Sequence, residues 1–127
     1  MIKQIAIKTS KRNEFIDITA RIQDLVEDVL EGVVTVFVPH TTTGITINEN
    51  ADPDVPRDIL RKLEEMIPRR DNYSHMEGNS DAHIKASLFG SSVRVIVKDS
   101  QLLLGTWQSI FFCEFDGPRT RQLYVQF

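Results

Sequence analysis

The chain has 127 residues, of which 41% are hydrophobic and 26% charged, a composition typical of a globular protein with one domain over residues 1–127. Lys and Arg number 15 and Asp and Glu 18, so the net charge of −3 excludes nucleic-acid binding through overall basic charge. No apolar run approaches the roughly 20 residues needed to cross a bilayer, so we expect no membrane partner.

The single cysteine, Cys113, excludes a disulfide within the chain and favours a reducing compartment. Residues 1–8 alternate like a strand and lack the apolar core of a secretion signal. We therefore expect a cytoplasmic protein.

The N-terminal segment predicts one strand and one helix. Residues 2–8 alternate as a strand, and residues 15–16 resume pairing briefly. The following apolar residues recur at helical spacing, with Asp17 or Thr19 as the cap and Gly32 as the stop. The apolar stripe of this helix consists of Ile22, Leu25, Val26, Val29 and Leu30.

A polar cluster interrupts two predicted strands in the next segment. Residues 33–38 are β-branched and aromatic, which predicts a strand covered on both faces, and Pro39 should end its pairing. Residues 45–48 alternate as a second strand. His40, three consecutive threonines and Glu49 therefore gather near the break, which makes the segment a candidate site. The alternative is a polar sheet edge, since threonine is a good strand residue.

A second helix and a long loop follow. Asp54 can cap the helix and Pro68 should end it. Residues 68–82 have no periodicity, and long ordered loops in small domains are often functional. Residues 83–89 predict a short helix stopped by Gly90, with a strand as the alternative. The stripe of the second helix consists of Ile59, Leu60, Leu63, Met66 and Ile67.

The C-terminal third predicts strands at residues 93–97, 102–104, 106–115 and 119–127. Both faces of residues 106–115 are largely apolar, so this strand should be central to the core or lie at a subunit interface. Cys113 fits there as a small buried hydrophobe.

Two arginines on the last strand predict an anion site. Arg119 and Arg121 lie on the same face, where paired guanidinium groups can hold a phosphate or carboxylate. The hydroxyls of Thr41 and Thr42 can add hydrogen bonds. The alternative is that the arginines pair with Glu114 or Asp116.

All three histidines, His40, His75 and His83, lie in the irregular or polar segments. Three imidazoles with an open fourth position are typical of zinc sites, and Glu49 or Asp81 could add a ligand. We therefore predict a divalent metal, zinc or magnesium. Hydrogen-bonded structural histidines are the alternative.

Five motifs, in this order, resemble the YjbQ family of secondary thiamine-phosphate synthase-type proteins, over Ile2 to Phe127. They are His40-Thr-Thr-Thr-Gly-Ile-Thr-Ile-Asn-Glu49, Tyr73-Ser-His75, Asn79-Ser-Asp-Ala-His83, Leu104-Gly-Thr-Trp-Gln108 and Asp116-Gly-Pro-Arg-Thr-Arg121. The chain departs from the family pattern at Thr43, where the family often has alanine, and at Ser100, where it often has glycine.

The resemblance implies an α+β fold, a single compact YjbQ-like domain with mixed β-sheets and two main helices. It also implies that the domain forms a homotrimer, with a cleft near a subunit boundary. It implies the joining of a pyrimidine pyrophosphate to a thiazole phosphate, as a main or a weak secondary activity. The alternatives are a non-catalytic trimeric protein that binds a metal or a phosphorylated metabolite and, third, a metal-dependent hydrolase. The site residues so assigned are His40, Glu49 and His83 as catalytic groups, Thr41, Thr42, Trp107, Gln108, Arg119 and Arg121 for the phosphorylated heterocycle, and His40, His75 and His83 for the metal.

Overall fold

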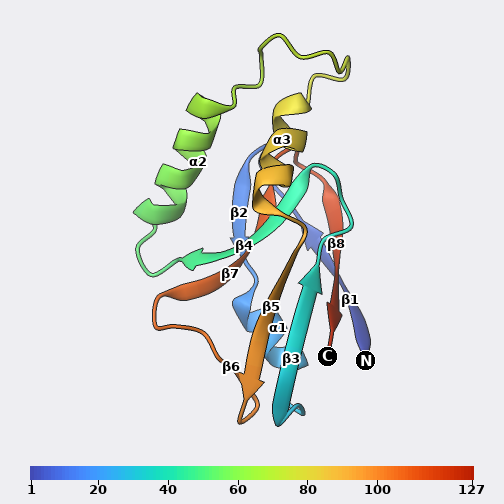
Figure 1. Ribbon diagram of the computed structural model, residues 1–127, viewed down its shortest axis with the longest axis vertical. Helices are drawn as coiled ribbons and strands as arrows, with labels where there is room; N and C mark the ends of the chain where they lie inside the picture. Colours follow the sequence, from blue (N-terminus) through green and yellow to red (C-terminus); the bar gives the residue numbers. More distant parts are fainter.

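The computed structural model describes all residues, 1–127, and confirms the α+β fold (Figure 1). Eight strands and three helices occur in the order β1 (Ile2–Lys8), β2 (Glu14–Asp17), α1 (Thr19–Leu25), β3 (Glu31–Phe37), β4 (Thr43–Glu49), α2 (Asp54–Met66), α3 (Ser80–Phe89), β5 (Ser92–Lys98), β6 (Gln101–Leu102), β7 (Gln108–Glu114) and β8 (Thr120–Gln126).

The strands form two sheets in which every ladder is antiparallel. The five-stranded sheet has the order β1-β8-β3-β5-β6, and the three-stranded sheet has the order β2-β7-β4. Strand β7 is therefore the central strand of the smaller sheet. Its pairing places Glu114 opposite Thr43 of β4 and opposite Glu14 of β2.

The main core lies between the two sheets, because the inward faces of both are β-branched and aromatic. Alternating residues of β3, β5 and β8 meet Ile110 and Phe112 of β7, and α1 closes the core with Ile22 and Val26. All four of these side chains have 0% exposure. The periodicity of the helix around Ile22 thus correctly predicts its buried face.

A second, smaller core covers the other face of β7. There Phe111, Cys113 and Phe115 pack against Ala82 and Ala86 of α3. Both faces of β7 are buried, which confirms the prediction that this strand is central. Burial also raises the pKa of the Cys113 thiol well above its ordinary value, so the side chain behaves as the small hydrophobe predicted.

Several element boundaries differ from the sequence predictions, and those of two helices bear on the fold. Helix α1 ends at Leu25, and Gly32 lies inside β3 rather than stopping a helix. Because β3 pairs with β5 from Glu31, opposite Lys98, the helix cannot continue to Gly32, and residues 26–30 form the turn that connects the helix to the strand. Leu30 is accordingly 67% exposed. Helix α3 begins at Ser80, which shortens the predicted loop by three residues (80–82).

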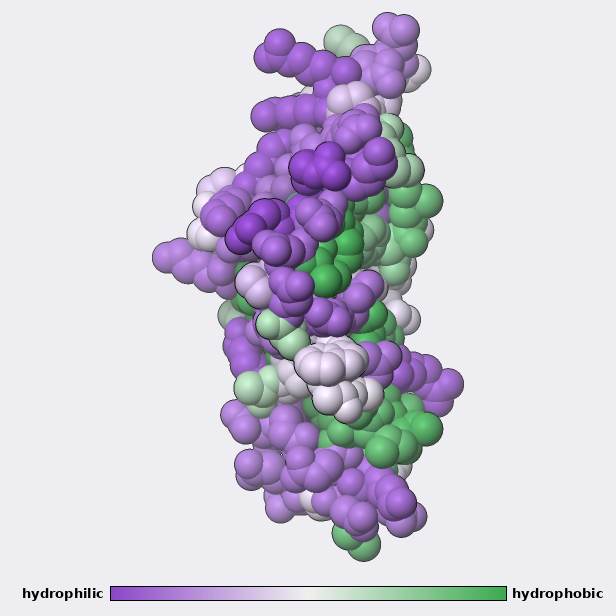
Figure 2. Space-filling model, turned by 90° about the vertical axis from the view of Figure 1, so that its left-hand side faces the viewer, coloured by the Kyte–Doolittle hydropathy of each residue, from purple (hydrophilic) through white to green (hydrophobic).

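Helix α2 lies to one side of the sheets and has no buried residue (Figure 1). Figure 2 shows hydrophobic areas between hydrophilic ones on this side of the molecule. The outer face of the larger sheet also exposes apolar side chains, including Ile2, Phe37 and Ile96. No helix is both long and apolar enough to span a bilayer.

Candidate functional site

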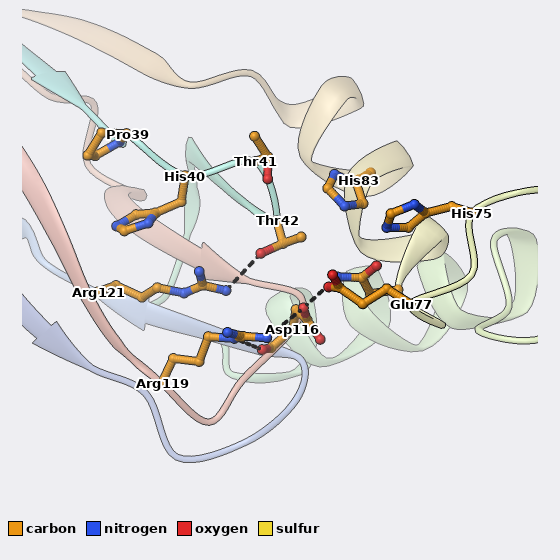
Figure 3. Close-up of a pocket in the computed structure, with 11 residues that line it drawn as sticks. Pro39, His40, Thr41, Thr42, His75, Glu77, His83, Asp116, Arg119 and Arg121 are labelled. Atoms are coloured by element: carbon orange, nitrogen blue, oxygen red, sulfur yellow. Dashed lines mark hydrogen bonds and ion pairs between the residues drawn. The ribbon is translucent and has the colours of Figure 1, made fainter.

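A polar cleft of about 420 Å³ opens where the end of β3, the start of α3 and the start of β8 come together (Figure 3). None of its lining residues is hydrophobic. The lining residues are Pro39, His40, Thr41, Thr42, His75, Glu77, Asn79, His83, Asp116, Arg119 and Arg121.

The polar segment after β3, residues 40–42, is held in the cleft by backbone hydrogen bonds at both of its ends. Val38 donates its N–H to Ser91 O at 2.8 Å, and Pro39 then ends the pairing because it has no N–H. Thr42 O accepts a hydrogen bond from Phe115 N–H at 3.2 Å, next to the start of β4. His40 and Thr41 therefore project from a short, anchored turn between two strands.

Arg121 lies on the core-facing side of β8 and is bound by a buried carboxylate. Its Nε donates to Glu114 Oε1 at 2.8 Å, and its Nη2 donates to Glu114 Oε2 at 2.6 Å and to Thr42 Oγ1 at 2.9 Å. The side chains of Arg121 and Glu114 are 7% and 0% exposed. Nη1 has no partner in the chain, so one edge of the guanidinium group remains available to a ligand.

Glu114 is the most heavily hydrogen-bonded side chain beside the cleft. Besides Arg121, it accepts hydrogen bonds from Thr9 Oγ1 at 2.8 Å and from the N–H groups of Phe115 and Asp116 at 3.1 and 3.0 Å. A buried carboxylate with this many donors is fully satisfied. The pair therefore fixes the guanidinium group at the base of the cleft.

Arg119 is held less tightly. Its Nη2 donates to Asp116 Oδ2 at 3.1 Å and its Nε to Asp116 O at 2.8 Å, and its side chain is 52% exposed. Because water reaches this guanidinium group, exchanging Asp116 for a ligand costs less than it would at the buried Arg121. The two arginines thus both form the ion pairs considered as the alternative, Arg121 with Glu114 and Arg119 with Asp116. Only the pair of Arg121 is fixed in place by burial.

The wall opposite Arg121 is acidic. Asn79 Nδ2 donates to Glu77 Oε2 at 2.7 Å and to Asp116 Oδ2 at 2.9 Å, while Asn79 Oδ1 is buried with no partner. Arg12 binds both Asp116, at 3.2 Å, and Asp81, at 2.8 Å. The cleft therefore combines hydroxyls and two guanidinium groups with the carboxylates of Glu77 and Asp116, the second of which is paired with Arg119.

A buried ionic network lies behind this acidic wall. Asp81 is 0% and Lys85 1% exposed, and the two side chains lie 3.3 Å apart, with Glu64 of α2 also bound to Lys85. Burial raises the pKa of Asp81, but the hydrogen bond and charge of Arg12, together with Lys85, outweigh it and hold the pKa below its ordinary value of 3.8. The network fastens the start of α3 to α2 and to the 9–13 segment.

His40 lines the edge of the cleft. Burial and the charge of Arg121 lower its pKa below the ordinary value of 6.5, against the opposing effects of Gln122 and Glu114. Its Nε2 lies 3.0 Å from Gln122 N and 3.1 Å from Gln122 O. Nδ1 has no partner in the chain.

His75 and His83 form a separate pair. Their rings are 5.4 Å apart and nearly perpendicular, at 88°, and neither side chain has a hydrogen-bond partner (Figure 3). His40 points away from them in the same view. No group of three His, Cys, Asp or Glu side chains could hold a metal ion. The three histidines thus line one cleft, but this arrangement does not form the predicted three-histidine metal site.

The other assigned residues lie elsewhere. Glu49 and Trp107 line a different cavity with Ala51 and Asp52, and Gln108 pairs with Glu49 in the ladder. Because Thr43 and Glu49 are at opposite ends of β4, they are separated by about 20 Å at the usual rise per strand residue. Within one chain, Glu49, Trp107 and Gln108 are therefore not part of the polar cleft.

Sequence reasoning did not identify Glu77, Asn79, Asp116 and Glu114 as members of this site. Glu114 alternates with Phe111, Cys113 and Phe115 along β7, so its position on an otherwise apolar strand was a usable signal. A carboxylate that faces a core needs a charged partner, and Arg121 on the core-facing side of β8 is the matching residue.

Comparison with known proteins gives one consistent result. The family model described as UPF0047 protein YjbQ-like matches residues 3–127. A UPF0047 protein of Methanocaldococcus jannaschii is 55% identical, over 99% of this chain and 93% of its own length. The UPF0047 protein YugU of Bacillus subtilis is 51% identical, over 99% and 98%.

Solved structures have the same fold. A YjbQ/UPF0047-family protein of Clostridium acetobutylicum superposes with a TM-score of 0.96 at 54% identity, covering 98% of each chain. A YbjQ-like protein of unknown function from Sulfolobus solfataricus superposes with a TM-score of 0.93 at 32% identity, covering 98% of this chain and 94% of that one.

Proposed function

The chain belongs to the YjbQ-like UPF0047 family, and we propose that its polar cleft is an enzyme active site for a small phosphorylated heterocycle. One observation carries this proposal. Seven residues singled out in the sequence for chemistry line a single cleft that has no hydrophobic lining residue: His40, Thr41, Thr42, His75, His83, Arg119 and Arg121.

The cleft suits a ligand with an anionic end. Arg121 Nη1 is free and pre-oriented, because Glu114 holds the other edge of the guanidinium group. Arg119 can add a second guanidinium group by exchanging its hydrogen bonds to Asp116 for bonds to the ligand. Charge-assisted bonds from arginine to phosphate are about twice as strong as neutral hydrogen bonds. The Thr41 hydroxyl adds an uncharged donor on the same wall.

The facing carboxylates indicate that the ligand is more than a simple anion. Glu77 and Asp116 accept hydrogen bonds from Asn79 Nδ2, and Asn79 Oδ1 is a further acceptor, which has no partner in the chain. They favour an amino group or another donor on the ligand, which a substituted heterocycle provides. A cleft that only trapped inorganic phosphate would not benefit from two carboxylates.

The reaction we assign to this site is the one implied by the family resemblance, formation of thiamine phosphate. The bond between the pyrimidine methylene carbon and the pyrophosphate oxygen breaks, and the oxygen keeps the electron pair. The lone pair of the thiazole nitrogen forms the new carbon–nitrogen bond. Arg119 and Arg121 would stabilise the charge on the departing pyrophosphate. His83, whose ring nitrogens have no partner in the chain, would donate a proton to it.

Three further properties are proposals that accompany this one. Zinc or magnesium remains a prediction from the sequence, to be checked by elemental analysis after dialysis against each metal. A homotrimer would cover the apolar residues exposed on the larger sheet and on α2. A cytoplasmic location is supported by the single cysteine.

The test is thiamine-phosphate formation from both precursors by wild-type protein, the His83→Ala variant and a Leu88→Ala control. Leu88 is 65% exposed on the same helix and lines none of the described cavities. We expect turnover by the wild type and the control and a loss of roughly 100-fold or more in His83→Ala, typical of a general acid–base group. Thermal unfolding would verify that all three proteins are folded.

Turnover that survives in His83→Ala would place the chemistry away from the cleft or in a contaminant. Absence of turnover in the wild type, with precursors still bound, would favour the non-catalytic binding protein. Absence of both turnover and binding would refute the assignment of the cleft to a phosphorylated heterocycle.

A further inference from the structure

A second cleft, of about 520 Å³, adjoins the first and shares part of its wall. His40, Thr41 and His83 line both. The other lining residues of the second cleft are Thr43, Ala86, Ser87, Gly90 and Ser91. The three consecutive threonines thus divide between the two clefts: Thr42 lines only the first, Thr43 only the second, and Thr41 both.

The two clefts differ in charge. The first is lined by Arg119, Arg121, Glu77 and Asp116, whereas no Lys, Arg, Asp or Glu lines the second. An ionic group placed in the second cleft would lose hydration without gaining a counter-charge. Hydroxyl groups and imidazoles are the polar groups there, and they match an uncharged ligand that both donates and accepts hydrogen bonds.

Thr43 supplies the second observation. The residue is 1% exposed, and its Oγ1 is buried without any hydrogen-bond partner. Because nearly all buried hydroxyls are paired, an orphaned one at a cleft wall indicates a missing partner. Rotation of the Thr43 side chain toward the cleft would let a donor or acceptor on a ligand satisfy this hydroxyl.

The wall that carries Thr43 is rigid, as a specificity contact requires. Gly44 lies so close to the end of α3 that a Cβ on it would be 2.8 Å from Phe89 Cβ. Ile45 N–H donates to Gly90 O at 3.1 Å. The start of β4 and the end of α3 are therefore fixed against each other on either side of the cleft.

We propose that the second cleft holds the uncharged ring, a nitrogen heterocycle, of a ligand whose phosphate lies in the first cleft, and that Thr43 Oγ1 selects this ring by a hydrogen bond. The inference rests on the proposed function, since it assigns the two parts of the same ligand. The imidazoles of His40 and His83 offer faces on which a flat ring can stack. His83, which lines both clefts, then lies where the ring and its phosphorylated arm meet.

The test uses three probes and two matched variants. Pyrophosphate reports on the first cleft, the unphosphorylated hydroxymethylpyrimidine alcohol on the second, and hydroxymethylpyrimidine phosphate on both. Dissociation constants would be measured by calorimetry or NMR titration for the wild type, Thr43→Val and Thr46→Val. Thr46 is on the same strand and lines none of the described cavities, so it controls for the threonine-to-valine change itself.

We expect Thr43→Val to weaken the alcohol and the phosphate ester by a similar factor, roughly 5- to 20-fold for one hydrogen bond to a buried group. Pyrophosphate affinity should stay within about twofold, and Thr46→Val should resemble the wild type. Unchanged affinities for both pyrimidine probes in Thr43→Val, or no binding of the alcohol to the wild type, would overturn the inference. If pyrophosphate still binds in that case, the proposed function of the first cleft is retained. If pyrophosphate does not bind the wild type, the proposed function itself is contradicted.

Discussion

The buried pair of Glu114 and Arg121 allows a quantitative prediction. Replacing Arg121 by methionine keeps the volume of the side chain but leaves Glu114, at 0% exposure, without its cation. The carboxylate would lose both arginine hydrogen bonds, of 2.8 and 2.6 Å, and keep only the uncharged donors Thr9, Phe115 and Asp116.

Hydrogen bonds to charged groups contribute about 1.5–3 kcal/mol each, so losing two costs about 3–6 kcal/mol. This agrees with the 3–5 kcal/mol usually lost when one partner of a buried ion pair is removed. For a domain of this size, each kcal/mol lowers the midpoint of thermal unfolding by roughly 3–5 °C. Arg121→Met should therefore melt on the order of 10–25 °C below the wild type.

The assay is urea unfolding followed by circular dichroism, with the double variant Glu114→Gln/Arg121→Met as the control. Removing both charges eliminates the unpaired carboxylate, so the double variant should regain most of the lost stability. A single variant within about 1 kcal/mol of the wild type, or a double variant no more stable than the single, would refute the role assigned to this pair.

Four further predictions follow from the same structure. The pKa of His40 should be below 6.5 in an NMR titration. Because the unfolded chain binds the proton at higher pH than the folded chain, the free energy of unfolding should decrease as the pH falls through 6.5. The pKa of Asp81 is also lowered, so this residue stabilises the protein above pH 3.8 and ceases to do so as the pH falls through its pKa in the folded protein. Arg12→Met should shift this loss of stability to higher pH in acid unfolding curves. Cys113 should not react with a thiol reagent until the protein unfolds, and rapid labelling of the native protein would contradict its burial. Light scattering should give three times the mass of one chain, and a monomer would contradict the proposed trimer.

Much of the fold could be predicted, because apolar residues recur with a clear helix or strand spacing in the segments that form the core. The stripe of Ile22 and Val26 identifies the inner face of α1, and the apolar run of β7 identifies a strand with two buried faces. The end of α1 could not be read from propensity, since pairing of Glu31 with Lys98 decides where the helix stops.

The candidate site could be predicted only in part. Motifs separated by up to 81 positions, such as His40 and Arg121, do meet in one cleft. Sequence spacing cannot show that Glu49 lies at the far end of its strand, or that His40 Nε2 contacts the backbone of Gln122. Those facts depend on strand direction and on tertiary register, which no local pattern encodes.

The most direct test of the central claim is NMR chemical-shift mapping of isotope-labelled protein titrated with pyrophosphate. The account predicts saturable shifts centred on Thr41, Thr42 and Arg119, and their weakening in Arg119→Ala but not in Arg61→Ala, which removes an arginine exposed on α2. Shifts centred instead on Glu49 and Trp107, or equal binding by both variants, would contradict the claim that the polar cleft is the phosphate-binding site.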